Sequence, residues 1–531
     1  MSTKLSCLEA ILAEIGNFGK FQYKIVSLIS LAIMAIYMPA IIWIFETKVP
    51  NYRCEIRGCE TQPAEYKPAW WEEAIPSVDG EPSTCERYKL VNASLPNQCV
   101  FDKSIVERCD EYIYETSERS TLHDFNLHCE ENYWKLTLIG TMTNTGLFIG
   151  LPITGMLSDR FGRKTVLLGC IISTGFAGLI RSFSNSYVFF ITMSFLDSVA
   201  RGGSFTNAYI IALEFVAPEK RTVVGVLLNI SCSISGVFVG ALAWSLQTWR
   251  TLDQILYGAS LIMVTYYWLL PESVRWLLTR NMYTKVEKIL RNIAKTNGTN
   301  LSEQNLKTLW KSDTSEVSPE SRHKFKELLK SPILTRRYIN CAIFWGVGLF
   351  SYYGLTINSV ALSSNPYFDF ILTMLVEIPG SVLVYFMLDR IGRRYTLATG
   401  FFTCAVSCLS FIFVPEDLYW LQLCIYLFGK FGTAIVVAIV YIVTSECFPT
   451  NLRSSLLSSC SMCGRLGGML APQIPLLKTY WEQLPLVLFG SSAVVGSILS
   501  LQLPETVGTT LPDTVEEAEN IGKLGSTEDT M

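Results

Sequence analysis

Apolar residues are gathered into runs of about twenty, and this feature constrains the fold more than any other. A helix of that length crosses the roughly 30 Å hydrocarbon core of a bilayer. Of the 531 residues, 50% are apolar and 17% are charged, whereas a soluble chain carries about 25% charged residues. The sequence therefore predicts an all-α membrane protein. Its twelve predicted spans cover about residues 23–45, 133–157, 165–183, 187–214, 222–247, 253–270, 338–357, 368–388, 396–414, 417–446, 454–476 and 484–503.

Positive charges flank these spans mainly on one side. The short connections 158–164 and 389–394 each hold three Lys or Arg, and segment 271–337 holds fourteen against seven Asp or Glu. Because Lys and Arg favour the cytoplasmic side, both termini are predicted to be cytoplasmic. The first span lacks a small-residue cleavage site and is long enough to cross, so we expect a retained helix rather than a signal peptide.

Segment 46–132 is then predicted to be extracellular, and its cysteines support this. An even number of cysteines in one polar loop indicates disulfides formed in an oxidising compartment. Their fifteen possible pairings stay open at this point. Asn92, followed by Ala and Ser, is a glycosylation acceptor. The predicted disulfide cysteines are Cys54, Cys59, Cys85, Cys99, Cys109 and Cys129.

Three motifs occur twice in register, which indicates an internal duplication. Residues 155–164, 214–221 and 271–274 are echoed at 389–394, 446–453 and 504–507, always 230 to 233 positions later. The sequence therefore predicts two six-helix halves in parallel duplication. The predicted parts are a cytoplasmic N-terminus (1–22), the first half (23–270, including the loop 46–132), a cytoplasmic linker with short helices (271–337), the second half (338–503) and a cytoplasmic tail (504–531).

These motifs resemble those of a known family. The D-R-x-G-R-R/K loops are similar to the signature of the major facilitator superfamily. The six-cysteine loop, the P-E-S-V-R-W stretch at 271–276, E-C-F-P-T at 446–450 and the stretch 503–512 resemble the organic cation, carnitine and organic anion transporters within it. The likeness extends over about residues 10–520 and implies two bundles that rock about a site near the bilayer midplane.

Repeated Asp, Glu and Arg residues lie where helices are predicted to reach the cytoplasm. We expect ion pairs between the halves to latch the inner gate when the site faces outward, Glu214 with Arg221 and Glu446 with Arg453 included. The alternative is that the cations only fix topology. The predicted gating residues are Asp159, Arg160, Gly162, Arg163, Glu214, Arg221, Asp389, Arg390, Gly392, Arg393, Glu446 and Arg453.

Two opposite charges lie near the middle of predicted spans. A charged side chain there costs about 2.5–3.5 kcal/mol on insertion scales and usually faces a cavity. Glu377 precedes Pro379, which can loosen the helix, and Arg465 stands among glycines that allow close approach. The two would either pair with each other or divide a substrate, with the carboxylate facing an ammonium and the guanidinium facing a carboxylate.

The family resemblance sharpens this expectation. An acid at Glu377 resembles the cation and carnitine branches, whereas a base at Arg465 resembles the carnitine and anion branches. Together with Lys430 they are most similar to the carnitine-type, zwitterion-handling branch. Lys430 is equally compatible with pairing to Glu446 or another acid. Asp197 and Arg201, four apart, are predicted to neutralise each other.

Aromatic rings are the third predicted element of the site. Ring faces attract ammonium groups by about 0.5–2 kcal/mol, and the family's matching residues of the seventh helix look like cavity residues; plain packing is the alternative. The predicted substrate-binding residues are Glu377, Arg465, Trp345, Tyr352, Tyr353, Tyr441 and Lys430.

The sequence thus predicts a plasma-membrane secondary transporter of small organic ions, either zwitterions or cations with an ammonium group. Carnitine, betaine, β-alanine-like or amine-conjugate solutes fit this pattern. Alternatives are a voltage-driven organic cation facilitator, an organic anion exchanger, or a ligand-binding receptor. No phosphate loop or zinc motif is present, so we expect no enzyme, cofactor, metal or nucleic-acid partner. The three histidines lie outside the spans, so no histidine proton relay is expected; Na⁺ or H⁺ coupling and the oligomeric state stay open.

Overall fold

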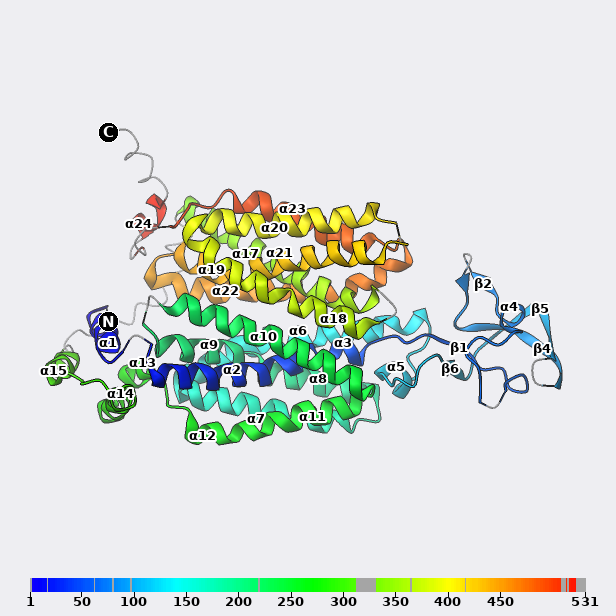
Figure 1. The fold of residues 1–531 in the computed structure, drawn as a ribbon, viewed down its shortest axis with the longest axis horizontal. Helices are drawn as coiled ribbons and strands as arrows, with labels where there is room; N and C mark the ends of the chain where they lie inside the picture. Colours follow the sequence, from blue (N-terminus) through cyan, green and yellow to red (C-terminus); the bar gives the residue numbers. More distant parts are fainter. Residues whose placement is uncertain are drawn as a thin grey trace.

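A computed structural model shows a long helical bundle with a small β-rich domain at one end (Figure 1). It describes residues 2–521 except 17, 62, 79–80, 96–97, 218–219, 312–330, 363–364, 416, 508–511 and 513–514. We call the end with the β-rich domain the loop side and the opposite end the linker side. Both described chain ends lie on the linker side, together with the short helices α1 (Ser2–Glu14), α13 (Val274–Thr279), α14 (Tyr283–Asn297), α15 (Glu303–Lys311) and α24 (Val515–Asn520).

Helices occupy all twelve predicted spans. Seven helical segments of the described chain are individually long and apolar enough to cross a membrane. The first half holds α2 (Lys20–Ile41), α3 (Trp43–Glu46), α6 (Glu130–Phe161), α7 (Arg163–Ser182), α8 (Tyr187–Arg201), α9 (Ser204–Glu214), α10 (Arg221–Leu246), α11 (Trp249–Leu261), η2 (Ile262–Thr265) and α12 (Tyr266–Leu269). The second half holds α17 (Pro332–Asn358), η3 (Ser359–Ala361), α18 (Pro366–Leu375), α19 (Glu377–Arg390), α20 (Arg393–Ser410), η4 (Phe411–Phe413), α21 (Tyr419–Glu446), α22 (Thr450–Leu470), η5 (Ala471–Thr479) and α23 (Leu484–Ser500).

Several spans that the hydropathy pattern predicts as continuous are interrupted, and each interruption has a local cause. Pro379 lacks the N–H that would bond the Leu375 carbonyl, and the helix breaks at Val376 between α18 and α19. Between α8 and α9, a Cβ added to Gly203 would lie 1.9 Å from the Thr154 hydroxyl oxygen. Glycine at this break therefore lets α6 approach the backbone closely.

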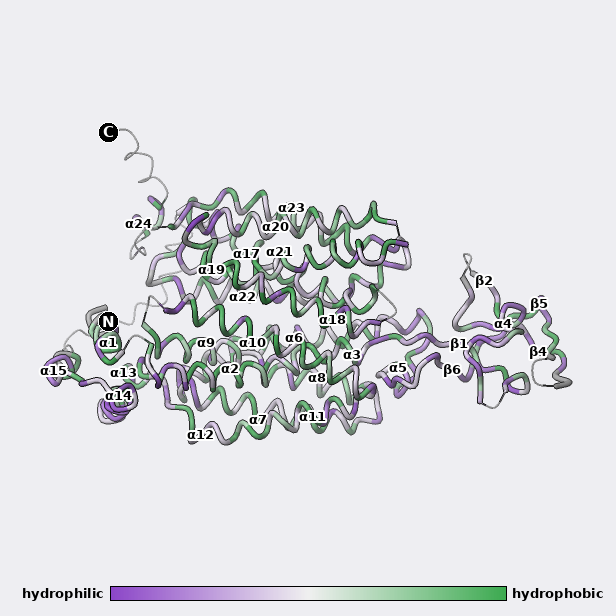
Figure 2. Tube along the Cα trace, in the orientation of Figure 1, coloured by the Kyte–Doolittle hydropathy of each residue, from purple (hydrophilic) through white to green (hydrophobic). Residues whose placement is uncertain are grey.

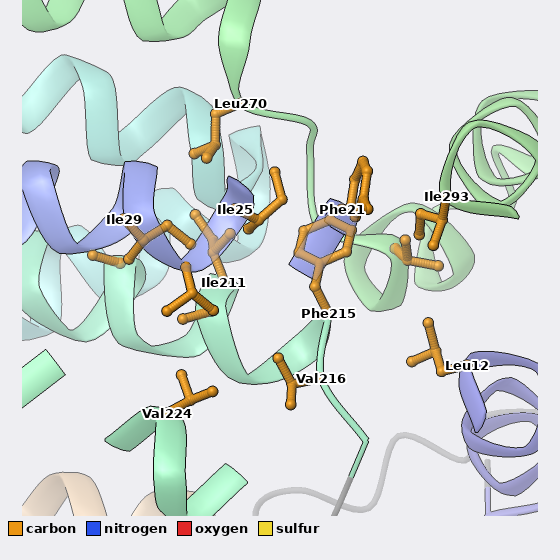
Figure 3. Packing of buried hydrophobic residues seen from close by; sticks show 14 of the residues in the cluster. Leu12, Phe21, Ile25, Ile29, Ile211, Phe215, Val216, Val224, Leu270 and Ile293 are labelled. Carbon is orange, nitrogen blue, oxygen red and sulfur yellow. The ribbon is translucent and has the colours of Figure 1, made fainter. Parts of the chain in front are cut away.

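Each half has its own hydrophobic core. In the first half, side chains of α1, α2, α9, α10 and α14 converge near the linker side (Figure 3), among them Leu12, Ile25, Ile211, Val224 and Ile293. The two linker-side helices α1 and α14 are thereby fixed to the first half. Figure 2 shows that hydrophobic residues concentrate in the bundle, whereas the linker helices and the β-rich domain are more hydrophilic.

The β-rich domain consists of three antiparallel strand pairs. They are β1 (Tyr52–Cys54) with β6 (Tyr112–Tyr114), β2 (Ser77–Val78) with β3 (Glu81–Pro82), and β4 (Glu86–Leu95) with β5 (Gln98–Arg108); the short helices α4 (Trp71–Ala74) and α5 (Thr121–Asp124) accompany them. Asn92 is exposed on β4, where a glycan has room. The six predicted cysteines form three disulfides, Cys54–Cys109, Cys59–Cys99 and Cys85–Cys129.

Histidine in this domain acts as a packing residue. His128 is 5% exposed, stacks on Tyr112 at 4.0 Å between ring centroids, and is hydrogen-bonded to the Tyr114 hydroxyl at 2.6 Å. Burial lowers the pKa of His128 to about 4 because the charged ring would lose its hydration. The ring is therefore neutral near pH 7 and completes an aromatic cluster beneath the strands.

Candidate functional site

A cavity of about 1050 Å³ lies between the two halves. Its walls come from α2, α6, α8, α9 and α10 of the first half and from α17, α19, α21 and α22 of the second. Six of the predicted substrate-binding residues line it: Glu377, Arg465, Trp345, Tyr352, Tyr353 and Tyr441. The seventh, Lys430, is fully buried behind this wall.

Lys430 is the counter-ion of Glu377. The break before α19 places Glu377 in the first turn of that helix, and the Lys430 ammonium lies 2.9 Å from its Oε1. The ammonium also lies 3.5 Å from the centroid of the Tyr352 ring and donates to the Thr356 hydroxyl at 2.6 Å. Ser233, from the first half, donates to the other Glu377 oxygen at 3.0 Å. The ammonium-binding groups predicted for a substrate are thus partly occupied by the chain's own lysine.

Arg465 has a different environment. Its guanidinium donates to the Tyr353 hydroxyl at 3.3 Å, and its buried Nε has no hydrogen-bond partner. Across the described residues, no carboxylate lies within ion-pair distance of it. Glu377 and Arg465 therefore face one cavity but do not pair with each other. The helix that carries Arg465, α22, packs directly on α17, because a Cβ on Gly467 would lie 2.1 Å from the Gly346 carbonyl oxygen and glycine avoids this clash.

The aromatic residues form a connected wall. Trp345 donates from its indole nitrogen to the Thr444 hydroxyl at 3.0 Å, and the Tyr441 ring meets it edge-on at 4.4 Å between centroids. Tyr352 shares a 2.7 Å hydrogen bond with Tyr37 across the halves. These contacts hold the rings in fixed orientations around the cavity.

The cavity wall includes residues that the sequence analysis did not assign to the site. Arg201 is one of them: it lies 3.9 Å from Asp197, which confirms the predicted pair, and it also lines the cavity. Tyr37, Asn229 and Ser233 also line it. A tyrosine or serine inside an apolar run gives no sequence signal of its own. Only a prediction of which face of each helix lines the cavity would have pointed to these positions.

The structure is open toward the linker side. A second cavity of about 1230 Å³ lies between the halves there; it is lined by Asp159 and Arg163 of the first half and Ser458 of the second, and Tyr441 lines both cavities. On the loop side the halves are in contact, because Phe45 packs against Tyr367 and Phe370 at 5.6 and 4.8 Å between ring centroids.

The repeated motifs of the first half meet at one point on the linker side. Arg163 lies 3.7 Å from Glu214 and 3.5 Å from Asp159, and the Ser273 hydroxyl donates to Glu214. We call Arg163, Glu214 and Ser273 the N-terminal motif cluster. Arg221 instead pairs with Glu9 of α1 at 2.8 Å. With the linker side open, Arg221 therefore does not pair with Glu214, because α10 starts at Arg221 with its side chain turned toward α1. A role of these two residues in the closed gate stays a prediction.

The second half repeats this arrangement. Arg393 lies 3.1 Å from Glu446, and the Thr506 hydroxyl donates to Glu446 at 2.6 Å. We call these three residues the C-terminal motif cluster. Arg453 donates instead to the Phe448 carbonyl at 3.3 Å. Each cluster lies within its own half, as expected when the linker side is open; an ion-pair latch between the halves stays a prediction for the opposite state.

A glycine forms a tight turn in each of the two short connections, 158–164 and 389–394. Gly162 and Gly392 have φ of 100° and 97°. Beyond each turn a carboxylate accepts backbone N–H groups: Glu272 from Lys164 at 3.0 Å, and Glu505 from Arg393 at 2.9 Å. Among the other predicted gating residues, Arg160 lies 5.3 Å from the ring centroid of the neighbouring Phe161, Arg390 is exposed, and the side chain of Asp389 lies outside the described residues.

Comparison with known proteins agrees with this architecture. The family described as "Sugar (and other) transporter" matches residues 109–517. Solute carrier family 22 member 1 of Bos taurus is 31% identical over 97% of this chain and 93% of its own length. Member 2 of Homo sapiens is 30% identical over 97% and 95%, and an organic cation transporter protein of Drosophila melanogaster is 29% identical over 98% and 96%.

The chain belongs to the solute carrier 22 family of organic cation transporters, within the major facilitator superfamily. The partially occluded, inward-open xylose transporter XylE of E. coli shares the fold, with a TM-score of 0.62 and 15% identity over 92% of this chain and 99% of that one. This solute carrier is thus a multi-pass membrane transporter of organic ions, not an enzyme.

Proposed function

We propose that this solute carrier moves small organic ions bearing a carboxylate across the plasma membrane by alternating access, with ammonium-carrying zwitterions as the preferred class. Carnitine, betaines, β-alanine-like amino acids and amine conjugates belong to this class. The observation that carries the proposal is Arg465, a cavity-facing guanidinium with no carboxylate at ion-pair distance in the described chain. A buried charge of this kind calls for a counter-ion, and a carboxylate suits the planar guanidinium.

The charge balance of the cavity wall supports an anionic group on the solute. Lys430 neutralises Glu377, and Asp197 neutralises Arg201, which leaves Arg465 as the uncompensated charge among these groups. An ammonium on the solute would then face Glu377 and the rings of Trp345, Tyr353 and Tyr441. Organic anions without an ammonium are the second candidate, because the same net positive charge favours them.

The test is uptake of labelled carnitine and of its methyl ester into vesicles that contain the purified chain. Arg465→Ala is expected to reduce carnitine uptake about tenfold or more, because a hydrogen bond to a charged group contributes about 1.5–3 kcal/mol. Uptake of the ester, which lacks the carboxylate, should fall much less. Arg465→Lys keeps the charge and should retain part of the carnitine uptake, and Arg291→Ala, which removes an exposed guanidinium of α14, is the matched control.

Equal losses for carnitine and its ester would contradict the assignment of Arg465. Uptake of simple monocarboxylates at the same rate as zwitterions would favour the organic-anion alternative. Uptake of cations alone would favour a cation facilitator.

A further inference from the structure

A cluster of buried charges lies in the first half, away from the cavity wall. It joins Glu46 of α3, Arg181 of α7 and Asp253 of α11, whose side chains are 0%, 2% and 0% exposed. Arg181 donates to both oxygens of Asp253, at 2.9 and 2.8 Å, and the same Nη2 donates to Glu46 Oε1. Its Nη1 donates to the Ser194 hydroxyl at 3.3 Å. We call Glu46, Arg181 and Asp253 the Arg181 cluster.

The cluster has more acids than bases. The neighbouring Tyr257 hydroxyl donates to Asp197 at 3.0 Å, and Asp197 lies 3.9 Å from Arg201. Three carboxyls thus share two guanidiniums, all of them buried. Fully ionised, the group would carry one uncompensated negative charge out of water, which is strongly unfavourable. One bound proton removes that charge.

The hydrogen bonds indicate which carboxyl holds the proton. Asp253 has the bidentate contact that a carboxylate makes best, because Arg181 donates from Nη2 to Oδ1 at 2.9 Å and from Nε to Oδ2 at 3.2 Å. Glu46 has one contact through Oε1, while its buried Oε2 has no hydrogen-bond partner in the described chain. A guanidinium already lies between the two acids, so a metal cation such as Na⁺ would meet a positive charge there. The geometry therefore favours a neutral Glu46.

Glu46 is also connected to the contact that closes the loop side. Its neighbour Phe45 packs on Tyr367 and Phe370 of the second half, and α3 is a four-residue helix separated from α2 at Ile42. Opening of the loop side must break the Phe45 contacts, which frees α3 from the second half. A cavity of about 340 Å³ on the loop side is lined by Phe45 and Leu252, the sequence neighbours of the two acids.

We propose that the Arg181 cluster is a proton-binding site that couples transport by this chain to protons, with Glu46 as the proton carrier. Displacement of α3 moves the Glu46 carboxyl relative to Arg181 and exposes it to the loop side, where the proton exchanges. The proposal rests on the transport function proposed above but not on the identity of the solute.

Other charged or titratable groups surround the cluster. Asp197 and Arg201 on α8 and Tyr257 on α11 adjoin it. Arg250, paired with Asp124, donates to the Ser182 carbonyl beside Arg181. The loop-side cavity is further lined by Lys48, Glu118, Arg119 and His123. Asp124 lies 2.7 Å from Arg250 and also accepts from the Trp249 indole. A second fully buried acid, Asp369 of α18, accepts from the Tyr419 hydroxyl at 2.6 Å and serves as a control.

The first test is infrared spectroscopy of the full-length chain in a glycoside detergent, which has no carbonyl group, without solute. A carbonyl stretch of a protonated carboxyl is expected to persist near neutral pH, where exposed carboxyls are ionised. The band should disappear in Glu46→Gln, which keeps the shape of the neutral acid, and remain in Asp369→Asn. A missing band in the unaltered chain, or one abolished by Asp369→Asn and kept by Glu46→Gln, would overturn the proposal.

The second test is uptake of labelled carnitine into vesicles with and without an imposed pH difference. The unaltered chain should respond to the pH difference, whereas whatever uptake Glu46→Gln shows should be the same with and without that difference. Uptake in Glu46→Gln that still follows the pH difference would contradict the coupling role. If carnitine is not a solute, the infrared result still decides whether the proton site exists, so the two proposals fail separately.

Discussion

The two halves of this solute carrier agree at the linker side and differ at the level of the cavity. Each half brings an arginine, a glutamate and a hydroxyl together, Arg163 with Glu214 in the first and Arg393 with Glu446 in the second. In both, a glycine with positive φ turns the chain. A shared geometry after duplication is expected where both halves perform the same movement.

The charges deeper in the halves follow no such repeat. The first half holds its arginines against acids, as Arg181 is held by Asp253. The second half pairs Lys430 with Glu377 but leaves Arg465 facing the cavity. The comparison teaches that the repeated residues share one geometry in both halves, whereas the unrepeated charges are the ones on which the proposed solute and proton sites rest.

Removal of Lys430 is expected to have the largest effect on stability among the substitutions that test this difference between the halves. Lys430→Met leaves the Glu377 carboxylate in the wall without its counter-ion, and breaking a buried pair costs about 3–5 kcal/mol. We expect a marked fall in the thermal stability of the detergent-purified protein. The double variant Lys430→Met with Glu377→Gln removes both charges and should recover most of the loss.

Arg465→Met is the matched control, because this arginine has no carboxylate partner at ion-pair distance in the described chain. It should cost little stability. A loss as large as that of Lys430→Met would mean that the two cations of the second half are held alike, and the contrast between them would fail.

The sequence predicted the halves better than their contacts. Apolar runs and the three repeated motifs determine spans and duplication because both are local patterns. The pairing of Arg163 with Glu214 joins residues of different helices, and the fixed spacing of Glu and Arg along the chain did not point to it. The charges of Glu377 and Arg465 indicated a cavity, but the lysine that neutralises Glu377 lies 53 residues away on α21, and only packing reveals it.

The two glycine turns test whether the repeated geometry is equivalent. A Cβ at Gly162 would lie 2.4 Å from Glu272 Oε2, and one at Gly392 would lie 2.4 Å from Glu505 Oε2. At φ near 100° and ψ of 152° and 165° the backbone is one that essentially only glycine adopts, and another residue there costs about 1–3 kcal/mol. Gly162→Ala and Gly392→Ala should therefore lower thermal stability and uptake to similar extents. Gly258→Ala, where an added Cβ meets nothing within 4 Å, is the control. A large effect of only one alanine would show that the halves do not use their turns equally.

The smallest expected effect concerns a contact that joins the halves. The Tyr37 and Tyr352 hydroxyls share a hydrogen bond of 2.7 Å, worth about 0.5–1.5 kcal/mol. Tyr352→Phe keeps the ring beside the Lys430 ammonium and removes only the hydroxyl. The fall in thermal stability that it causes therefore reports the contact between the halves and not the Lys430–Glu377 ion pair within the second half.

Tyr37→Phe should cause the same loss of thermal stability, and the double variant should lose no more than either alone, since both substitutions remove the same hydrogen bond. Tyr209→Phe is the control, because Tyr209 of the first half contacts Tyr441 of the second through its stacked ring. Additive losses from Tyr37→Phe and Tyr352→Phe would show that the hydroxyls act separately, and the cavity wall would then be held by each half on its own.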